Sequence, residues 1–555
     1  PSDLSLFKFT LNEDGESYSV TNKDRFLSGK IALPDYYNDM PVTNVAAYGF
    51  KYCMAMEQIY IPYTYRVVEP CAFSASGLKE VYIEEGLKTI KTYAFSNLSN
   101  ISYFEIPASV EDIQKYAVTH MFQLPMYDYF PIEEQQRMDD FKFTTAPGGN
   151  YVWDKNDKAL YDSQYKTILY LSTGVTVLNV KTTIEEINPC LCEQYPKLTT
   201  VNISGNVREI GSAAFSSCRS LKDFNITGSI QYIRGAEEEY YEGIEVPRNG
   251  ALFNTAIESI TFPSGLKFLG IGTFFYCNRL TQVNLPDTVE YISEQAFENF
   301  TYNISGKNWQ GRQSLGGLVS ITMSNGGNDY YYIDQNKALI EKGTGENGGD
   351  TFLFYGMNAP GTEYSIPEGV TSLNMFSFAF NANLTTLTIP EGLIEIPGTF
   401  AQNSDNLTTV NFPNSLKYIT NAPGKSEEVL RWGNVQKGYT WGAFLNCFKL
   451  ENINFNQNSQ MEIIEVNSFN GIGCQTFFIP ASVKEIEPFS IYSRYLTAYQ
   501  VDANNQYFCV DENGVLFSKD MKILASYPMG KTAAEYEVPA GVEEIGMTAF
   551  NTCLN

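Results

Sequence analysis

The stretch Ile210-Gly211-Ser212-Ala213-Ala214-Phe215-Ser216-Ser217-Cys218 decides the fold, because its pattern returns along the chain. The pattern reappears from Leu269 to Cys277 and from Ile545 to Cys553. Successive Phe positions are separated by 22 or 23 residues, as Phe50 and Phe73 are. A fixed period of this length is typical of repeat architectures, in which each unit stacks on the next and none folds alone.

A second block follows the first in each unit, as in Leu384-Thr385-Thr386-Leu387-Thr388-Ile389-Pro390. Apolar and polar residues alternate at its end, which predicts a short strand with one face on a core, and Pro ends the ladder because it has no N–H. The Val207 to Ile210 stretch predicts a second strand. We therefore predict a β-rich repeat solenoid, a right-handed superhelix of about 13 units of 22–23 residues with two short parallel strands per unit.

The repeated Phe and Cys positions are expected in the core. We expect Phe215, Phe274 and Phe297 to be nearly fully buried and each to stack on its neighbour's equivalent. Degenerate units have Val118 or Cys192 in place of Phe, or a Phe that comes one or two residues early (Phe400, Phe489). Five of the ten cysteines lie three residues after a repeat Phe: Cys53, Cys218, Cys277, Cys447 and Cys553. A buried free Cys acts as a small hydrophobic residue, so we expect free thiols rather than disulfides.

Three longer gaps contain a related module, as in Tyr151 to Tyr161, Tyr332 to Ile340 and Cys509 to Phe517. Aromatic and β-branched residues flank an Asp-x-Asn turn, which predicts β-hairpins built into the solenoid. A calcium loop would need further carboxylates and a closing bidentate Glu, so we interpret the motif as a plain turn. This organisation divides one continuous solenoid into an N-terminal strand or cap segment (1–30), repeat blocks (31–121, 184–300, 370–500), hairpin modules (122–183, 301–369, 501–540) and the start of a further repeat (541–555).

Composition limits the possible partners. The formal charge is −25, which argues against nucleic acid, because phosphate binding needs clustered Lys and Arg. The sequence contains no run of 18 apolar residues, so we predict no transmembrane segment. We expect a monomer, and the start at Pro1 without a signal-peptide pattern suggests an export signal that has been removed.

The sequence offers little for catalysis. There is one histidine, His120, so Ser-His or Cys-His pairs and two-His metal sites have a single possible member, and we expect it to be structural or on the surface. Adjacent carboxylates such as Glu185-Glu186 fall at exposed strand positions, although composition alone leaves glycoside hydrolysis open. We predict no enzyme, no catalytic residues, no metal site and no cofactor.

The combined unit Leu-x-x-Ile-x-Ile-Pro-x-x-Val-x-x-Ile-x-x-x-Ala-Phe-x-x-Cys resembles the BspA-like, Treponema-type class of leucine-rich repeats, with Leu384 to Pro390 and Ser482 to Ile486 as close matches. The resemblance covers the chain apart from the hairpin modules and the first residues. It implies a surface or secreted protein of a host-associated bacterium, in some members lipid-anchored, that binds host proteins or other bacteria. Its motif is structural, so no functional residue carries over.

A binding site is expected on the outward strand position, the residue between the last two apolar ones. We single out Tyr60, Tyr82 and Tyr103 as binding residues, because rigid aromatic side chains suit an anchor for a host or bacterial surface protein. A glycan ligand is the alternative, with Trp309, Trp432 and Trp441 in or near insertions, and a spacer without a ligand is a third. The outward column along the chain is Tyr60, Tyr82, Glu105, Asn202, Asn225, Thr261, Asn284, Thr388, Asn411, Asn454, Phe478 and Gln500. Its Asn and Thr members are expected to form a self-satisfied ladder.

Overall fold

A computed structural model describes residues 2–119, 141–236, 249–293, 295–297, 317–420 and 442–553, and the backbone alone at 240–241, 244–245, 428–431 and 434–437. The chain divides into two compact units, one formed by residues 1–257 and 261–275 and the other by residues 258–260 and 276–555. His120, and Trp309, Trp432 and Trp441 of the glycan alternative, lie outside the described residues.

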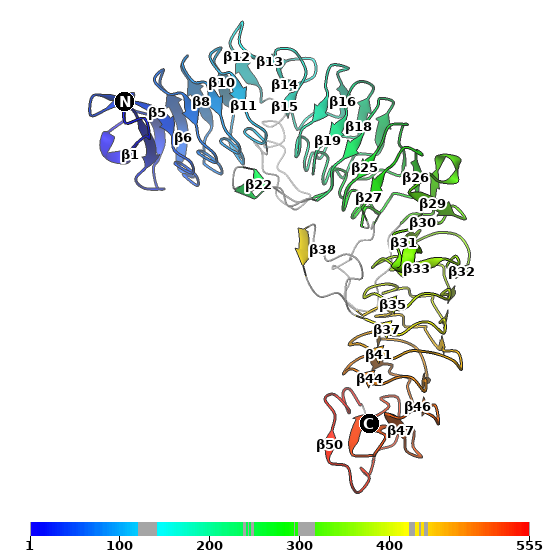
Figure 1. Ribbon diagram of the computed structural model, residues 1–555. Helices are drawn as coiled ribbons and strands as arrows, with labels where there is room; N and C mark the ends of the chain where they lie inside the picture. The colour runs from blue at the N-terminus through cyan, green and yellow to red at the C-terminus, as the bar shows by residue number, and fades with distance from the viewer. Residues whose placement is uncertain are drawn as a thin grey trace. The chain divides into compact units, whose positions relative to one another are not determined.

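Each coil of the first unit contributes one strand to each of two sheets, and the coils stack side by side (Figure 1). Within the repeat both sheets are parallel, which confirms the prediction of two short parallel strands per unit. One sheet contains β3 (Gly29–Ala32), β6 (Met56–Ile61), β8 (Glu80–Ile83), β10 (Tyr103–Ile106) and β12 (Phe143–Thr145). The other contains β1 (Phe7–Leu11), β2 (Tyr18–Asn22), β4 (Tyr36–Tyr37), β5 (Met40–Val45), β7 (Val67–Val68), β9 (Thr89–Ile90) and β11 (Asp112–Ile113), after a short 3-10 turn at Leu4–Leu6.

The same arrangement continues through the rest of the first unit. The remaining strands are β13 (Tyr151–Asp154), β14 (Ala159–Asp162), β15 (Ile168–Leu171), β16 (Val177–Val180), β17 (Glu186–Ile187), β18 (Thr200–Ile203), β19 (Glu209–Ile210), β20 (Asp223–Ile226), β21 (Tyr232–Ile233), β22 (Tyr240–Tyr241), β23 (Ile244–Glu245) and β25 (Phe268–Leu269), with β24 (Ser259–Thr261) at the division between the units.

The second unit is built in the same way, with 3-10 turns at Ser324–Gly326 and Glu346–Gly348. Its strands are β26 (Gln282–Leu285), β27 (Tyr291–Ile292), β28 (Ser320–Met323), β29 (Tyr331–Asp334), β30 (Ala338–Glu341), β31 (Asp350–Tyr355), β32 (Glu363–Ser365), β33 (Val370–Leu373), β34 (Thr386–Thr388), β35 (Glu395–Ile396), β36 (Thr409–Asn411), β37 (Tyr418–Ile419), β38 (Glu428–Arg431), β39 (Asn434–Lys437), β40 (Asn452–Asn454), β41 (Ile463–Ile464), β42 (Phe469–Asn470), β43 (Thr476–Ile479), β44 (Glu485–Ile486), β45 (Ile491–Tyr492), β46 (Ala498–Val501), β47 (Phe508–Val510), β48 (Leu516–Ser518), β49 (Ile523–Ser526) and β50 (Glu544–Ile545).

Burial follows the predicted alternation. In β8, Val81 and Ile83 are buried while Tyr82 between them faces outward, as period-two strands require. Tyr82 lies opposite Tyr60 in β6, and Ile83 lies opposite Ile61. Equivalent residues of neighbouring coils therefore form columns, and the inward columns make the core.

In most coils, the turn around the repeat Phe has left-handed backbone two residues before the ring, two residues after it, or both. Tyr48 and Tyr52 flank Phe50 with φ of +59° and +63°, and few of the equivalent residues in other coils are glycine. Hydrogen bonds between coils hold this geometry, since the Phe50 N–H donates to the Ala72 carbonyl at 2.7 Å. The expectation that Phe489 belongs to the core is wrong. It occupies the left-handed position (φ +61°), is 41% exposed, and leaves the core position to Ile491.

The Phe column is confirmed as core where the repeat is regular. Phe73 stacks between Phe50 and Phe95, with ring centroids 5.3 and 5.0 Å away. Phe215, Phe274 and Phe297 are almost fully buried, as expected.

Two details of the Phe column differ from the prediction. Phe215 does not stack on an equivalent ring, because the adjoining coils place Cys192 and Leu252 at its position, and it packs edge-on against Phe224 instead. Phe550, on the last described coil, stacks on Tyr527 but remains 38% exposed.

The hairpin and cysteine predictions are confirmed. β13, β14 and β15 pair antiparallel, as do β29, β30 and β31 and also β47, β48 and β49. In the first of these turns, the Asp154 carboxylate accepts the backbone N–H groups of Asn156 and Asp157 and lies 3.4 Å from the Lys181 amine. All ten cysteines are free, and eight are buried.

Candidate binding face

The structure brings the three predicted tyrosines together on the outward side of β6, β8 and β10. The tyrosine face is defined here as Tyr60, Tyr82 and Tyr103 with Glu80, Glu84 and Glu105, all partly exposed. Tyr60 and Tyr82 share one column. Tyr103 was predicted with them at the outward position, but it does not belong to their column. It lies opposite Glu80, two residues earlier in the strand. Its ring still reaches diagonally across to Tyr82, with centroids 4.8 Å apart and planes at 32°.

Aromatic and acidic residues alternate across this face. Phe104 lies opposite Val81, which places Glu105 opposite Tyr82 just as Tyr103 lies opposite Glu80. Neighbouring strands are about 4.8 Å apart, so each of these two rings has a carboxylate beside it along its own strand and another on the adjacent strand. The result is a checkerboard of two phenols and two carboxylates.

The phenols are hydrogen-bonded to these carboxylates. Tyr60 donates to Glu84, which also accepts the Tyr63 N–H at 2.9 Å. Tyr82 donates to Glu80 and Tyr103 to Glu105, each at 3.2 Å.

The phenol pKa values reflect these contacts. The hydrogen bond to Glu84 raises the pKa of Tyr60. Partial burial, followed by the nearby carboxylate charge, raises the pKa of Tyr82 and of Tyr103. The side chains are thus held in place in a negative field.

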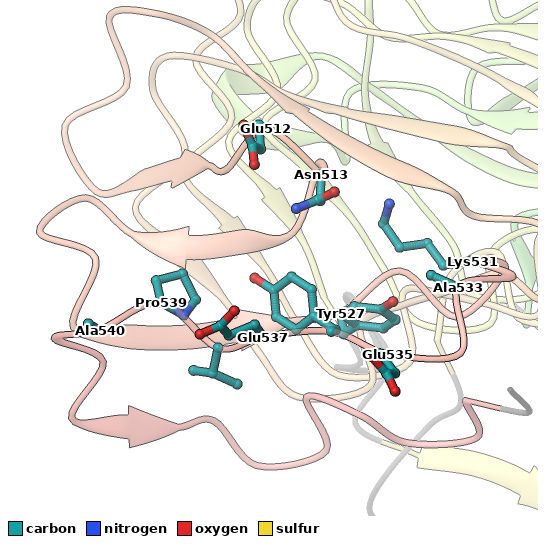
Figure 2. Close-up of a pocket in the computed structure, with 11 residues that line it drawn as sticks. Glu512, Asn513, Tyr527, Lys531, Ala533, Glu535, Glu537, Pro539 and Ala540 are labelled. Carbon is teal, nitrogen blue, oxygen red and sulfur yellow. The ribbon is translucent and has the colours of Figure 1, made fainter.

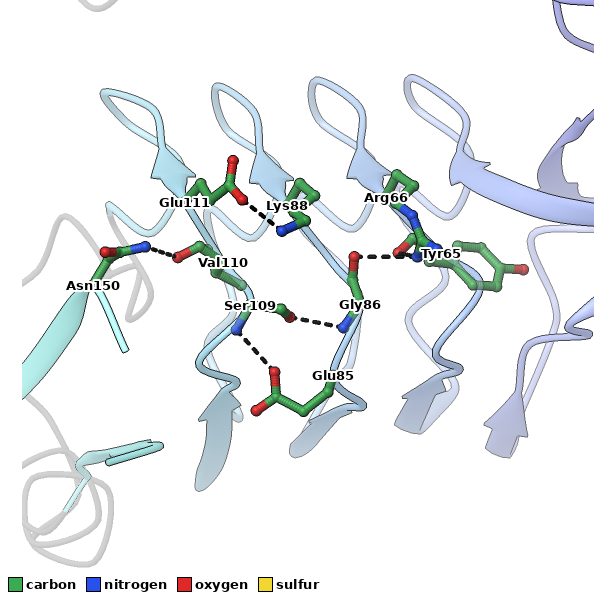
Figure 3. A network of polar contacts seen from close by, with 9 residues as sticks. All are labelled: Tyr65, Arg66, Glu85, Gly86, Lys88, Ser109, Val110, Glu111 and Asn150. Atoms are coloured by element: carbon green, nitrogen blue, oxygen red, sulfur yellow. Dashed lines mark hydrogen bonds and ion pairs between the residues drawn. The ribbon is translucent and has the colours of Figure 1, made fainter. Parts of the chain in front are cut away.

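Other carboxylates of these coils are used structurally (Figure 3). Glu85 accepts the backbone N–H groups of Ala108 and Ser109, each at 2.9 Å, and Lys88 pairs with Glu111 at 2.5 Å. Glu57 is likewise paired with Lys79 at 2.7 Å. In the described part of the chain, by contrast, Glu80, Glu84 and Glu105 form no ion pair.

Farther along, the same outward column is an amide ladder, as predicted. Asn225 donates to Asn202 and Asn202 donates to Asn179, each at 2.8 Å. In the second unit, Asn454 donates to Asn411 at 2.8 Å and Asn411 donates to Thr388 at 3.0 Å. These side chains satisfy one another along the sheet.

Sequence reasoning missed several members of the outward column, among them Thr144, Asn179, Thr322 and Ser365. They lie in strands that follow or adjoin the interruptions, where the Leu-x-x-Val-x-Ile spacing is broken. Alternation alone, as in Val177-Leu178-Asn179-Val180, could have found Asn179.

A cavity of about 320 Å³ lies in the last module, between the β47–β48 turn and the segment that precedes β50 (Figure 2). Tyr527 and Tyr536 line it with ring centroids 5.0 Å apart, together with Glu512, Asn513 and Lys531. The Tyr536 hydroxyl donates to the Asp511 carboxylate at 2.8 Å. The lining is mainly polar side chains around two rings.

Neither a metal site nor a membrane span emerges from the part of the chain that the structure describes. Among these residues no three His, Cys, Asp or Glu side chains gather as a metal would need. No described helix has the length and apolar character to cross a membrane.

The stacked coils, with a buried Leu, Val, Ile and Phe lining, define a leucine-rich repeat solenoid. A family model described as BspA type Leucine rich repeat region matches the chain in six copies. Together the copies cover residues 40–130, 164–237, 239–311, 350–423 and 440–511. These segments are more than half of the chain, so the chain belongs to this family.

Solved structures with the same repeat resemble the chain at low identity. A leucine rich cell surface protein from Faecalibacterium prausnitzii is 15% identical, over 98% of this chain and 94% of that one, with a TM-score of 0.32. The pneumococcal vaccine antigen PcpA is 15% identical over 99% and 93%, with a TM-score of 0.32. A leucine-rich repeat protein from Bacteroides ovatus is 15% identical over 74% and 88%, with a TM-score of 0.37. No curated protein matches the chain.

Proposed function

We propose that this chain is a non-catalytic recognition protein that binds a host or bacterial surface protein through the tyrosine face. One observation carries the proposal: three phenols lie together on an outward sheet face, bonded to carboxylates and partly exposed. Tyrosine loses little rotamer entropy on binding and offers a large amphipathic contact area, which is why it anchors protein interfaces.

An extracellular or cell-surface location accords with this role. The family to which the chain belongs supports it, and the similar protein from Faecalibacterium prausnitzii is a cell surface protein. Protease treatment of intact producing cells tests the location: the chain should be cleaved while a cytoplasmic control protein survives. Survival of the chain on intact cells contradicts it.

A protein array tests the function itself. The array carries purified host extracellular proteins and surface proteins of partner cells, and it is probed with the chain. Tyr60→Ala and Tyr82→Ala should each weaken the affinity for a bound protein about fivefold or more. Asn454→Ala, in the ladder of the second unit, is the matched control and should leave the affinity unchanged. Loss with the control and not with the tyrosine variants contradicts the proposal.

A glycan ligand is the second candidate, and the cavity beside Tyr527 and Tyr536 favours it. Aromatic rings beside carboxylate, amide and amine groups are the groups that sugar recognition uses. A glycan array probed with the parent and with Tyr536→Ala separates the two candidates. Binding lost in Tyr536→Ala and kept in Tyr82→Ala places a sugar site at the cavity, and no glycan binding by the parent removes this candidate.

A further inference from the structure

We propose that the tyrosine face takes a polypeptide segment that carries arginine side chains, an inference that rests on the proposed binding role and names its partner's chemistry. The argument starts from charge. Glu80, Glu84 and Glu105 are the carboxylates beside the rings, and none of them forms an ion pair within the described residues. Other carboxylates of these coils are paired with lysines of adjacent coils, as Glu57 is with Lys79 and Glu111 with Lys88.

The nearest lysines of the sheet do not fill this role. Lys30 lies opposite Gln58, and Lys142, which precedes Phe143, lies opposite Tyr103 by the register of β10 and β12. Both are exposed, and neither forms an ion pair with the three carboxylates. The Tyr hydroxyls hold the carboxylates in position and leave their charge in place.

The checkerboard geometry then selects the cation. Glu80 and Glu105 are diagonal neighbours on adjacent strands, a relation in which residues lie roughly 7–8 Å apart, so their like charges repel. A planar guanidinium can stack on a Tyr82 or Tyr103 ring while its N–H groups reach a carboxylate beside that ring. Arginine combines ring stacking with forked carboxylate binding, and an ammonium group cannot form that fork.

The shape of the face favours a polypeptide over a small cation. Small-molecule sites are concave, whereas this site is the outward surface of a five-stranded sheet. Three carboxylates spread over β8, its C-terminal end and β10 offer more than one point of attachment, which an extended chain with several arginines can use together.

A short labelled peptide of alternating arginine and serine is the probe, titrated by fluorescence anisotropy in salt of about 0.15 M. The triple variant E80Q/E84Q/E105Q should weaken binding about tenfold or more, and Tyr82→Ala about fivefold or more. The matched control is E185Q/E368Q/E544Q, which removes the same charge from exposed carboxylates elsewhere and should stay within about twofold. A peptide with citrulline for arginine should bind at least about tenfold more weakly.

Several results would overturn the inference. If the control triple variant weakens binding as much as the face variant, the peptide senses only net charge. If a matched peptide with lysine in place of arginine binds as tightly as the arginine peptide, the guanidinium assignment is wrong. If no arginine peptide binds while Tyr82→Ala still weakens binding to an arrayed protein, this inference fails and the proposed function stands. If Tyr82→Ala changes no interaction of any kind, the proposed function fails as well.

Discussion

Tyr60 and Tyr82 of the tyrosine face occupy the same outward position of the coil as the amide ladder of the first unit, and the two regions use their polar atoms in opposite ways. In the ladder, Asn225, Asn202 and Asn179 bond to one another along the column at 2.8 Å. In the tyrosine face, each phenol instead bonds to a carboxylate, and the carboxylates keep an uncompensated charge. The ladder is closed on itself, while the tyrosine face has unused binding capacity.

The difference follows from side-chain length and chemistry. An Asn amide has a donor and an acceptor at nearly the same height above the sheet, so stacking at about 4.8 Å joins successive amides. A Tyr hydroxyl lies far from the backbone and reaches over its neighbours to a Glu. The repeat therefore fixes where an outward residue lies, and the side chain alone decides whether that position is structural or free to bind.

The largest expected effect on stability comes from removing a buried Phe ring in the core of either region. Phe73→Ala, beneath the tyrosine face, should lower the free energy of unfolding by about 3–5 kcal/mol, since the ring is fully buried between two others. Phe215→Ala, beneath the ladder, should cost about 1 kcal/mol less, because its equivalents are not aromatic. Denaturant unfolding followed by circular dichroism measures both. Phe26→Ala, 78% exposed, is the control, and a Phe73 variant as stable as this control would refute the core assignment.

A smaller effect should separate the outward positions themselves. Asn202→Ala leaves Asn179 without its donor and Asn225 without its acceptor, and should cost about 1 kcal/mol of stability. Tyr82→Phe removes only a hydroxyl that bonds to a carboxylate and should change stability by less than about 0.5 kcal/mol. The same unfolding assay compares them. Equal losses would mean that the phenol–carboxylate bonds are structural, and the contrast would disappear.

The regular coils were predictable from sequence because one period sets both the strands and the Phe column. Alternation in β8 and its equivalents predicted which residues face out, and Asn-rich columns predicted the ladder. The position of Phe489 was not predictable, since a ring one or two residues out of phase falls on a left-handed backbone position that spacing does not reveal.

The tyrosine face was predicted in part. Tyr60 and Tyr82 followed from the period, but Tyr103 comes two residues earlier in its strand, and only the register shows its ring reaching Tyr82. The role of Glu84 was also missed, because it lies beyond the strand and contacts Tyr60 from the neighbouring coil. Contacts between coils depend on register and rotamer, which a single repeat does not encode.

Glycine substitution should show that both regions share the same turn. Ala75 and Ala213 have φ of +53° and +54°, a conformation that costs a non-glycine residue about 1–2 kcal/mol. Ala75→Gly should stabilise the chain by about 0.5 kcal/mol, after the added entropy of the unfolded chain. Ala213→Gly should be close to neutral, because it also removes a buried methyl group that packs with Tyr116 and Cys190. Melting temperatures would show this order, and destabilisation by Ala75→Gly would refute the assigned strain.

The smallest expected effect on stability, and the most specific one, concerns the titration of Tyr60. Its folded-state pKa is raised above the ordinary value of about 10, chiefly by the hydrogen bond to Glu84. The phenol therefore contributes stability that is present below pH of about 10 and is lost as the pH rises through the folded-state pKa, whereas the amide ladder does not titrate. Glu84→Gln should lower the pKa of Tyr60 and remove this contribution, and the loss of stability at neutral pH should be small because the phenol is partly exposed. Tyrosinate absorbance, taken as the difference between each protein and its Tyr60→Phe counterpart, isolates this one phenol. Glu111→Gln, whose carboxylate pairs with Lys88, should leave the Tyr60 titration as it is in the parent. An unchanged pKa in Glu84→Gln would mean that the carboxylate does not hold Tyr60, and the tyrosine face would lose the fixed geometry on which its binding role depends.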